Sequence, residues 1–190
     1  MAMTTGTLTP LEARALEWIA PFSQAEHLVR ARDYVLELAP DAPLAVRFAA
    51  LTHDIERHFP GGPQQHFAED DWDDPDYLFA HSTRSADIVQ RWLAESPAPP
   101  DRDFVRRVRR LILLHELGGD AEADLLQAAD SLSFLETLQD LVVGWVADGR
   151  CSPGKAEAKL RYMRDRIRIA EARRRADALY AGAVARLPSA

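Results

Sequence analysis

Residues 44–55 read LAVRFAALTHDI, an almost continuous apolar run that carries the adjacent pair His53-Asp54 near its end. A helix that is apolar on nearly all sides is buried, so this run predicts a central helix in the core of the protein. Residues 60–63 read PGGP, and prolines and glycines of this kind predict that the helix has ended by there. The run therefore predicts a histidine and an aspartate at the end of a core helix.

Helix signals recur on both sides of this run, whereas strand signals are scarce. Capping boxes, prolines at first helical positions and aspartates before apolar segments predict helix starts, and glycine pairs predict helix ends. The predicted helices run from Thr9 through Ile19, from Ser23 to about Ala39, from Pro75 to about Ala94, from Asp101 to His115, from Asp120 through Leu135, and from about Gly154 to about Leu187. We therefore expect an all-α helical bundle.

The length and composition of the chain fit one domain. The chain has 190 residues, of which 47% are hydrophobic, and this is enough to bury a sizeable core. No repeat of fixed period occurs in the sequence, so a solenoid is not expected. We predict a single domain over residues 1–190.

The charge balance limits the partners of the protein. The formal net charge is −7 at pH 7. Binding of nucleic-acid polymers or anionic membranes relies on an excess of Lys and Arg, so neither partner is expected. The sequence contains no run of about 20 apolar residues, so a membrane span is not predicted. The single cysteine, Cys151, cannot form an internal disulfide, and we therefore expect a cytoplasmic protein. The oligomeric state stays open, a homodimer included.

Six side chains of metal-binding type occur in the predicted helices: His27, His53, Asp54, His81, His115 and Asp130. They come from five predicted helices, as a metal site in the core of a bundle requires. In the adjacent pair, the imidazole can bind one metal while the Asp54 carboxylate bridges to a second. Asp130 lies on an otherwise apolar helix face, where a carboxylate is costly unless it is paired or bound to a metal. The pattern predicts a metal-dependent hydrolase.

The order of these six residues resembles the HD-domain superfamily, all-helical metal-dependent phosphohydrolases named for their His-Asp pair. The resemblance covers about residues 23–140, which would form the core of a single-domain HD-type helical bundle, with a C-terminal helical extension over about residues 152–187. Two details resemble bacterial HD proteins that hydrolyse diadenosine tetraphosphate. These are the run HDIERHFP at residues 53–60 and the interval of fifteen residues between His115 and Asp130.

The resemblance implies a centre of two divalent transition metal ions. One ion would be held by His27, His53, Asp54 and Asp130, and the other by His81, His115 and the bridging Asp54. Two such ions lower the pKa of a shared water, so that a metal-bridging hydroxide can attack phosphorus in line. The expected activity is hydrolysis of a phosphoester or phosphoanhydride bond in a nucleotide or another small phosphate compound.

Two arginines are candidates for binding the substrate phosphate. Arg57 lies one helical turn beyond Asp54, and a guanidinium binds phosphate oxygens in pairs, so we predict a catalytic role for Asp54 and a catalytic and substrate-binding role for Arg57. Arg84 follows His81 by three residues and shares its helix face, which makes it the second substrate-binding candidate. The basic residues between 155 and 168 are interleaved with acids, and we interpret most of them as a solvated helix face.

The metal and the chemistry stay open at this point. Mixed histidine and carboxylate ligands suit Fe, Mn, Co, Zn or Ni. The six-ligand pattern also resembles HD-fold di-iron oxygenases such as myo-inositol oxygenase, which would consume dioxygen. A third interpretation is a degenerate, non-catalytic HD module that serves as a binding protein, although the intact ligand set argues against it.

Overall fold

The computed structural model describes residues 6–67 and 71–188. Over these residues the chain forms nine α-helices and one short 3₁₀ helix, and no strand, so the predicted all-α class is confirmed. The elements are α1 (Pro10–Ile19), α2 (Ala25–Leu38), α3 (Leu44–Ala50), η1 (Ile55–His58), α4 (Pro75–Ala94), α5 (Arg102–Leu114), α6 (Ala121–Thr137), α7 (Gln139–Ala147), α8 (Pro153–Asp165) and α9 (Ala170–Val184).

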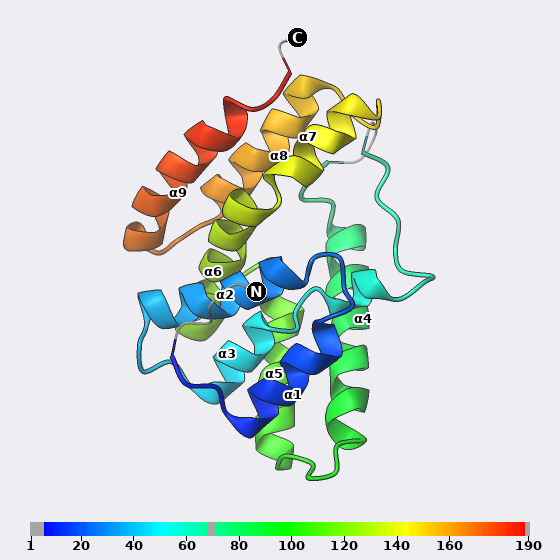
Figure 1. Ribbon diagram of the computed structural model, residues 1–190, viewed down its shortest axis with the longest axis vertical. Coiled ribbons are helices and arrows are strands. Elements are labelled where there is room, and N and C mark those ends of the chain that lie inside the picture. Colours follow the sequence, from blue (N-terminus) through cyan, green and yellow to red (C-terminus); the bar gives the residue numbers. More distant parts are fainter. Residues whose placement is uncertain (1–5, 68–70, 189–190) are drawn as a thin grey trace.

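Helix α6 lies at the centre of the molecule (Figure 1). It contacts α2, α3 and α5, which precede it in the chain, and α7, α8 and α9, which follow it. Helices from the preceding and the following parts of the chain cover α6. Four of its side chains therefore have no exposed surface: Leu126, Ala129, Leu132 and Leu135. Asp130 belongs to the same helix, and its carboxylate is therefore carried into the interior of the bundle.

The central apolar run forms a shorter helix than the sequence predicts. Helix α3 ends at Ala50, and His53-Asp54 lie in a turn that leads into η1. Two side chains bind carbonyls that a longer helix would use: Thr52 Oγ1 donates to Phe48 O at 2.8 Å, and His53 Nδ1 donates to Ala50 O at 2.9 Å. The predicted placement of His53 and Asp54 on a helix is therefore wrong.

The C-terminal segment forms two helices rather than the single predicted one. Residues 166–169 separate α8 from α9 and contain neither glycine nor proline. The break lies where the guanidinium of Arg166 reaches into the core, donating to Ser131 Oγ at 2.8 Å and to the carboxylates of Glu116 and Asp130. The end of α8 therefore coincides with contacts of Arg166 to residues that lie far from it in the sequence.

Most of the predicted helix starts are confirmed. Asp101 and Asp120 cap α5 and α6, because each side chain accepts hydrogen bonds from the first turn of its helix. The sequence Ser23-Gln24-Ala25-Glu26, which predicts a capping box at the start of the second helix, does not form one, since α2 begins after Gln24 with no side-chain cap hydrogen bond.

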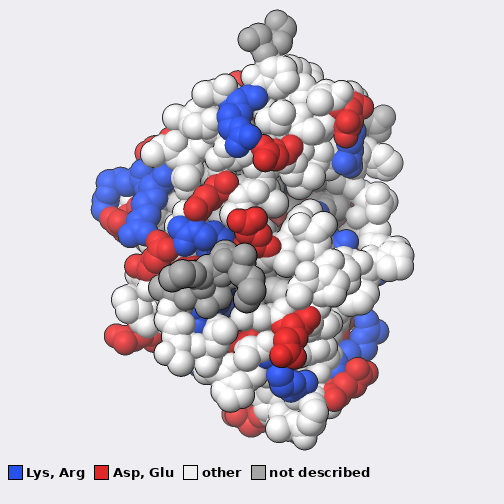
Figure 2. Space-filling model, in the orientation of Figure 1, with Lys and Arg blue, Asp and Glu red and all other residues white. Residues whose placement is uncertain are grey.

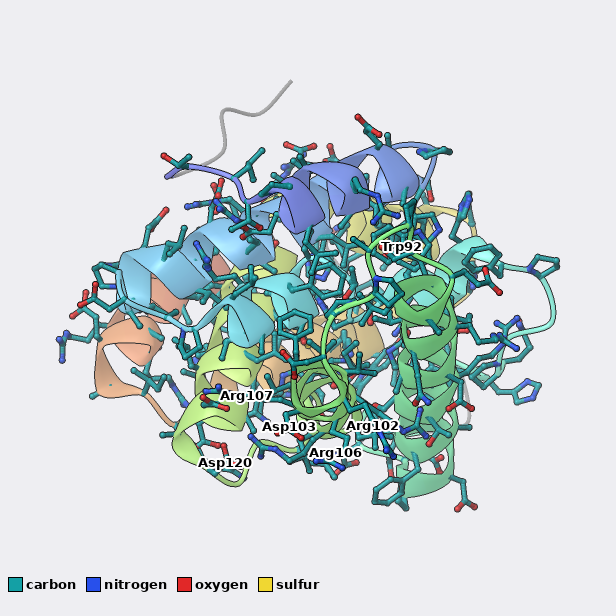
Figure 3. All side chains as sticks on the ribbon, turned by 90° about the horizontal axis from the view of Figure 1, so that it is seen from below. Trp92, Arg102, Asp103, Arg106, Arg107 and Asp120 are labelled. Atoms are coloured by element: carbon teal, nitrogen blue, oxygen red, sulfur yellow. The ribbon has the colours of Figure 1, made fainter. Side chains whose placement is uncertain are left out.

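Acidic side chains balance the basic face of α5 (Figure 3). Arg107 and Arg110 both pair with Glu122, and Arg106 pairs with Asp103. Lysines and arginines are also interspersed with acids on the face of the molecule shown in Figure 2. Among the helices of residues 6–67 and 71–188, none combines the length and the apolar character that a membrane crossing needs.

A buried ion pair fastens α1 to α2. Glu12 Oε1 accepts from Arg32 Nε at 3.1 Å, and neither side chain has exposed surface. Glu12 also accepts from the backbone N–H of Thr9 at 2.9 Å. Burial alone would raise the pKa of Glu12, but the Thr9 hydrogen bonds and the charge of Arg32 outweigh it and lower the pKa below its ordinary value. The pair is therefore charged at neutral pH.

We expect Glu12→Gln to lower the free energy of unfolding by about 2 kcal/mol, because the buried guanidinium of Arg32 loses one of its two carboxylate partners and keeps Asp33. Chemical denaturation measures this change. The matched control is Glu17→Gln, which alters an exposed glutamate of the same helix and should change the free energy by less than about 0.5 kcal/mol.

The effect of this substitution should depend on pH. Since the pKa of Glu12 is lower in the folded protein than its ordinary value of 4.5, its stabilising contribution is fully present above that value. The contribution is lost as the pH falls through the folded pKa. An equal difference between wild type and Glu12→Gln at neutral and at strongly acidic pH would contradict this role.

Candidate metal centre

Four histidine side chains form a buried row. In order they are His27 from α2, His53 from the turn after α3, His115 at the C-terminal end of α5, and His81 from α4. Neighbouring ring centroids lie 5.3, 4.9 and 5.3 Å apart. None of the four residues is more than 1% exposed. The fold therefore brings four imidazoles from separate parts of the chain to one point.

Backbone hydrogen bonds orient two of these rings. Nδ1 of His53 lies 2.9 Å from Ala50 O, and Nδ1 of His115 lies 2.7 Å from Ile112 O. A carbonyl oxygen can only accept, so each Nδ1 carries a proton, and Nε2 carries the lone pair when the ring is neutral. In both rings the ligating atom is therefore Nε2.

Side chains orient the other two rings in the same way. Ser133 Oγ donates its proton to the His27 carbonyl at 2.7 Å, so it accepts the hydrogen bond from His27 Nδ1 at 2.9 Å. Nδ1 of His81 donates to Glu56 Oε1 at 2.8 Å, and Arg84 binds the other oxygen of that carboxylate at 2.8 Å. Partners of this kind hold a ligating imidazole in one tautomer and one orientation.

Asp130 lies at one end of the row. Its Oδ1 atom is 3.3 Å from Nε2 of His27 and 3.4 Å from Nε2 of His53, and its side chain is 5% exposed. Its Oδ2 atom accepts from Arg166. His27, His53 and Asp130 therefore form one group whose ligand atoms could hold a metal ion.

Asp54 lies among the remaining histidines. Its Oδ1 atom is 2.8 Å from Nε2 of His81, 3.6 Å from that of His115 and 4.0 Å from that of His53. A carboxylate beside three imidazoles can serve two ions at once. This position is compatible with the bridging role predicted for Asp54. The prediction also has Asp54 share an ion with His27, but His27 is not among the histidines nearest to Asp54.

Nε2 of His27, His53 and His115 is buried and forms no hydrogen bond of good geometry within the described residues, although each lies 3.3 to 3.6 Å from a carboxylate oxygen. A buried polar atom without a well-formed hydrogen bond is costly, and a cation shared between these imidazoles and carboxylates would satisfy all three. Three overlapping groups of side chains each place their ligand atoms within 4.8 Å of one another. Imidazoles and carboxylates are the donors that divalent transition metals bind, and the residues therefore fit such an ion.

Glu116 joins the predicted ligands. It forms a group with His81 and His115, and one of its oxygens lies 3.6 Å from Nε2 of His115. The sequence does not predict Glu116 as a ligand beside His115, because adjacent residues of a helix point in different directions. Here α5 ends at Leu114, and the turn that follows brings neighbouring side chains to the same site.

A cation from the C-terminal region also enters the site. The side chain of Arg166 is 6% exposed and pairs with both Glu116 and Asp130. It is thus an exception to the solvated face predicted for residues 155–168. No sequence signal marks it, because its role depends on where α8 packs against α6.

Burial and neighbouring charges shift the pKa values of these side chains in opposite directions. Burial raises the pKa of Asp130, but the positive charges of Arg166 and His53 outweigh it, and the pKa lies well below its ordinary value. The same competition, dominated by Arg166, lowers the pKa of Glu116 to about 2. Burial lowers the pKa of His53, but Asp130 and Asp54 raise it to about 9. A metal would meet ionised carboxylates and would displace the His53 proton.

A cleft reaches the carboxylates beside the row of histidines. The charged side chains that line it are Asp54, Arg57, Glu116, Asp130 and Lys159, and apolar side chains from the loop before α4 and from α6, α7 and α8 form most of the rest of its wall. Arg57 lines this cleft, and its role in phosphate binding stays a prediction. Its Nε donates to Asp54 Oδ2 at 3.0 Å, its Nη1 donates to the Tyr77 hydroxyl at 2.7 Å, and its side chain is 32% exposed.

Arg84 does not line this cleft. Besides Glu56, its guanidinium donates to the carbonyl oxygens of Phe59 at 3.3 Å and Pro60 at 2.6 Å. These bonds hold Glu56 against His81 and fasten the chain after η1. The structure thus places Arg84 behind the histidine row, not in the substrate-binding position that its spacing from His81 predicts.

We expect the purified protein to bind a divalent transition metal stoichiometrically, and chelation to lower its melting temperature. An ion present at 100 times its Kd would stabilise the folded protein by about 2.7 kcal/mol. Metal analysis and thermal unfolding measure both effects. His53→Ala should lose most of the metal, because His53 belongs to two of the ligand groups. His58→Ala, which alters an exposed histidine of η1, should retain it. Full metal content in His53→Ala would contradict the site.

Comparisons with protein-family models, with curated proteins and with solved structures found no match to this chain. The case for the metal centre therefore rests on its geometry. Four buried imidazoles lie beside ionised carboxylates, three of which line a cleft.

Proposed function

We propose that the protein is a metal-dependent phosphohydrolase that cleaves a phosphoester or phosphoanhydride bond of a nucleotide or another small phosphate compound. One observation carries the proposal: the same cleft is lined by three carboxylates of the candidate metal centre and by the cations Arg57 and Lys159. The order of the ligands along the chain, which resembles the HD-domain superfamily, supports the same reaction class and a centre of two ions.

The charge of the site favours an anionic substrate. Four carboxylates and four cationic side chains lie at or beside the row: Asp54, Glu56, Glu116 and Asp130, with Arg57, Arg84, Lys159 and Arg166. Their charges cancel. Two divalent ions would add four positive charges, and the loaded site would then attract an anion. A phosphate group meets this requirement, whereas a neutral polyol, as a di-iron oxygenase would take, does not.

The proposed reaction divides between the ions and the protein. Two divalent ions, when bound, acidify a shared water and neutralise phosphate charge, which is the chemistry that hydrolysis needs. Arg57 would bind the substrate, because its guanidinium can exchange the Asp54 carboxylate for a phosphate oxygen of the same charge and geometry. The hydrogen bond to Tyr77 keeps the guanidinium in the cleft during this exchange.

We expect the metal-loaded protein to release phosphate from at least one member of a panel of nucleotides and dinucleoside polyphosphates. Mn, Fe, Co, Zn and Ni are to be tested separately. Chelation should abolish the release, and Asp54→Asn should reduce it to the background rate, because Asp54 lies within reach of three of the four imidazoles. No release with any metal would overturn the proposal, and dioxygen consumption by the iron-loaded protein would then favour the oxygenase.

A second prediction concerns Arg57. Arg57→Met should lower kcat/KM by about 10- to 100-fold, the loss expected for one charged hydrogen-bonding group, while the metal content stays unchanged. Arg57→Lys should recover part of the loss, since it restores the charge but not the paired donors. Arg91→Met, which removes an exposed arginine from α4, serves as the control. Equal kcat/KM values for the wild type and Arg57→Met would exclude this role.

A further inference from the structure

Lys159 of α8 is the second cation that lines the cleft. Three aromatic rings surround its ammonium: the ring centroids lie 5.5 Å away for Trp72, 5.4 Å for Phe134 and 5.1 Å for Tyr162. The rings come from the loop before α4, from α6 and from α8 itself. Cation–π contacts therefore hold the ammonium from three elements of the fold.

The hydrogen-bonding capacity of this ammonium is unused within the described part of the chain. It forms no hydrogen bond and no ion pair with another described residue, whereas a lysine ammonium carries three donors. Glu116 and Asp130, which line the same cleft, are already paired with Arg166. Aromatic faces attract the charge but do not accept its hydrogen bonds as an oxyanion does. Lys159 is therefore placed to bind an anion in the cleft.

We infer that Lys159 binds a phosphate oxygen of the substrate together with Arg57, and this inference rests on the proposed phosphohydrolase function. The two cations enter the cleft from different elements, since Arg57 belongs to η1 and Lys159 to α8. A phosphate group has several oxygens and can be bound from two sides at once. The C-terminal helices would then supply part of the substrate site as well as neutralising the carboxylates.

The chain offers a matched control one helical turn away. Lys155 lies on the same face of α8, and its ammonium is also 5.5 Å from the centroid of Trp72. It pairs with Asp71 at 3.8 Å and does not line the cleft with the metal-centre carboxylates. A structural role in packing against Trp72 is therefore common to both lysines, whereas anion binding is expected of Lys159 alone.

The experiment measures the binding of inorganic phosphate to the full-length, Mn-loaded protein by isothermal titration calorimetry. Lys159→Met retains the apolar stem among the aromatic rings and should weaken phosphate binding by about tenfold or more. Lys159→Arg should recover most of the affinity, and Lys155→Met should match the wild type. The metal content and the melting temperature of each variant are measured in parallel, since a purely structural role of Lys159 would change these and not the phosphate affinity.

Two results would overturn the inference, and they are distinguishable. Wild-type phosphate affinity in a fully metal-loaded Lys159→Met protein would exclude Lys159 and leave the proposed function in place. Absence of phosphate binding in the metal-loaded wild type would remove both the role of Lys159 and the phosphohydrolase proposal on which it rests.

Discussion

A hydrogen bond from a histidine ring to the backbone carbonyl three residues earlier orients the two central histidines of the row. His53 makes this bond to Ala50, and His115 makes it to Ile112. Each bond engages a carbonyl at the end of a helix and leaves Nε2 as the atom that faces the carboxylates. Since the carbonyl belongs to the helix, the ring is as firmly placed as the helix itself. The same hydrogen bonds thus use carbonyls at the ends of α3 and α5 and orient the ligand atoms of His53 and His115.

Charge neutralisation then determines which helices must pack around the row. A carboxylate inside the bundle is tolerated only with a partner, and each of those at the site has a cationic one. Arg57 pairs with Asp54, and Arg166 pairs with Glu116 and Asp130. Because Arg166 follows α8, the C-terminal helices are part of the electrostatic balance of the centre. Arg166 thus ties the end of α8 to α6 and to the turn after α5.

Sequence reasoning succeeds where the signal is local and fails where it depends on packing. Asp101 and Asp120 mark helix starts by their own chemistry, and these starts are confirmed. Six side chains of metal-binding type could likewise be identified as candidate ligands, and the structure brings them together. The early end of α3 and the break before α9 involve side-chain hydrogen bonds that periodicity does not encode. Glu116 and Arg166 could not be found, since only the folded chain brings them to the row.

The exposure of the side chains across the site indicates how a substrate would approach. The exposed fraction is 32% for the Arg57 side chain, 11% for that of Asp54 and 0% for that of His53. Among the carboxylates beside the row, Asp130 and Glu116 are more buried than Asp54, at 5% and 7%. Of the three carboxylates that line the cleft, Asp54 is therefore the one most exposed to solvent. It is also the carboxylate that lies near the most imidazoles, those of His53, His81 and His115.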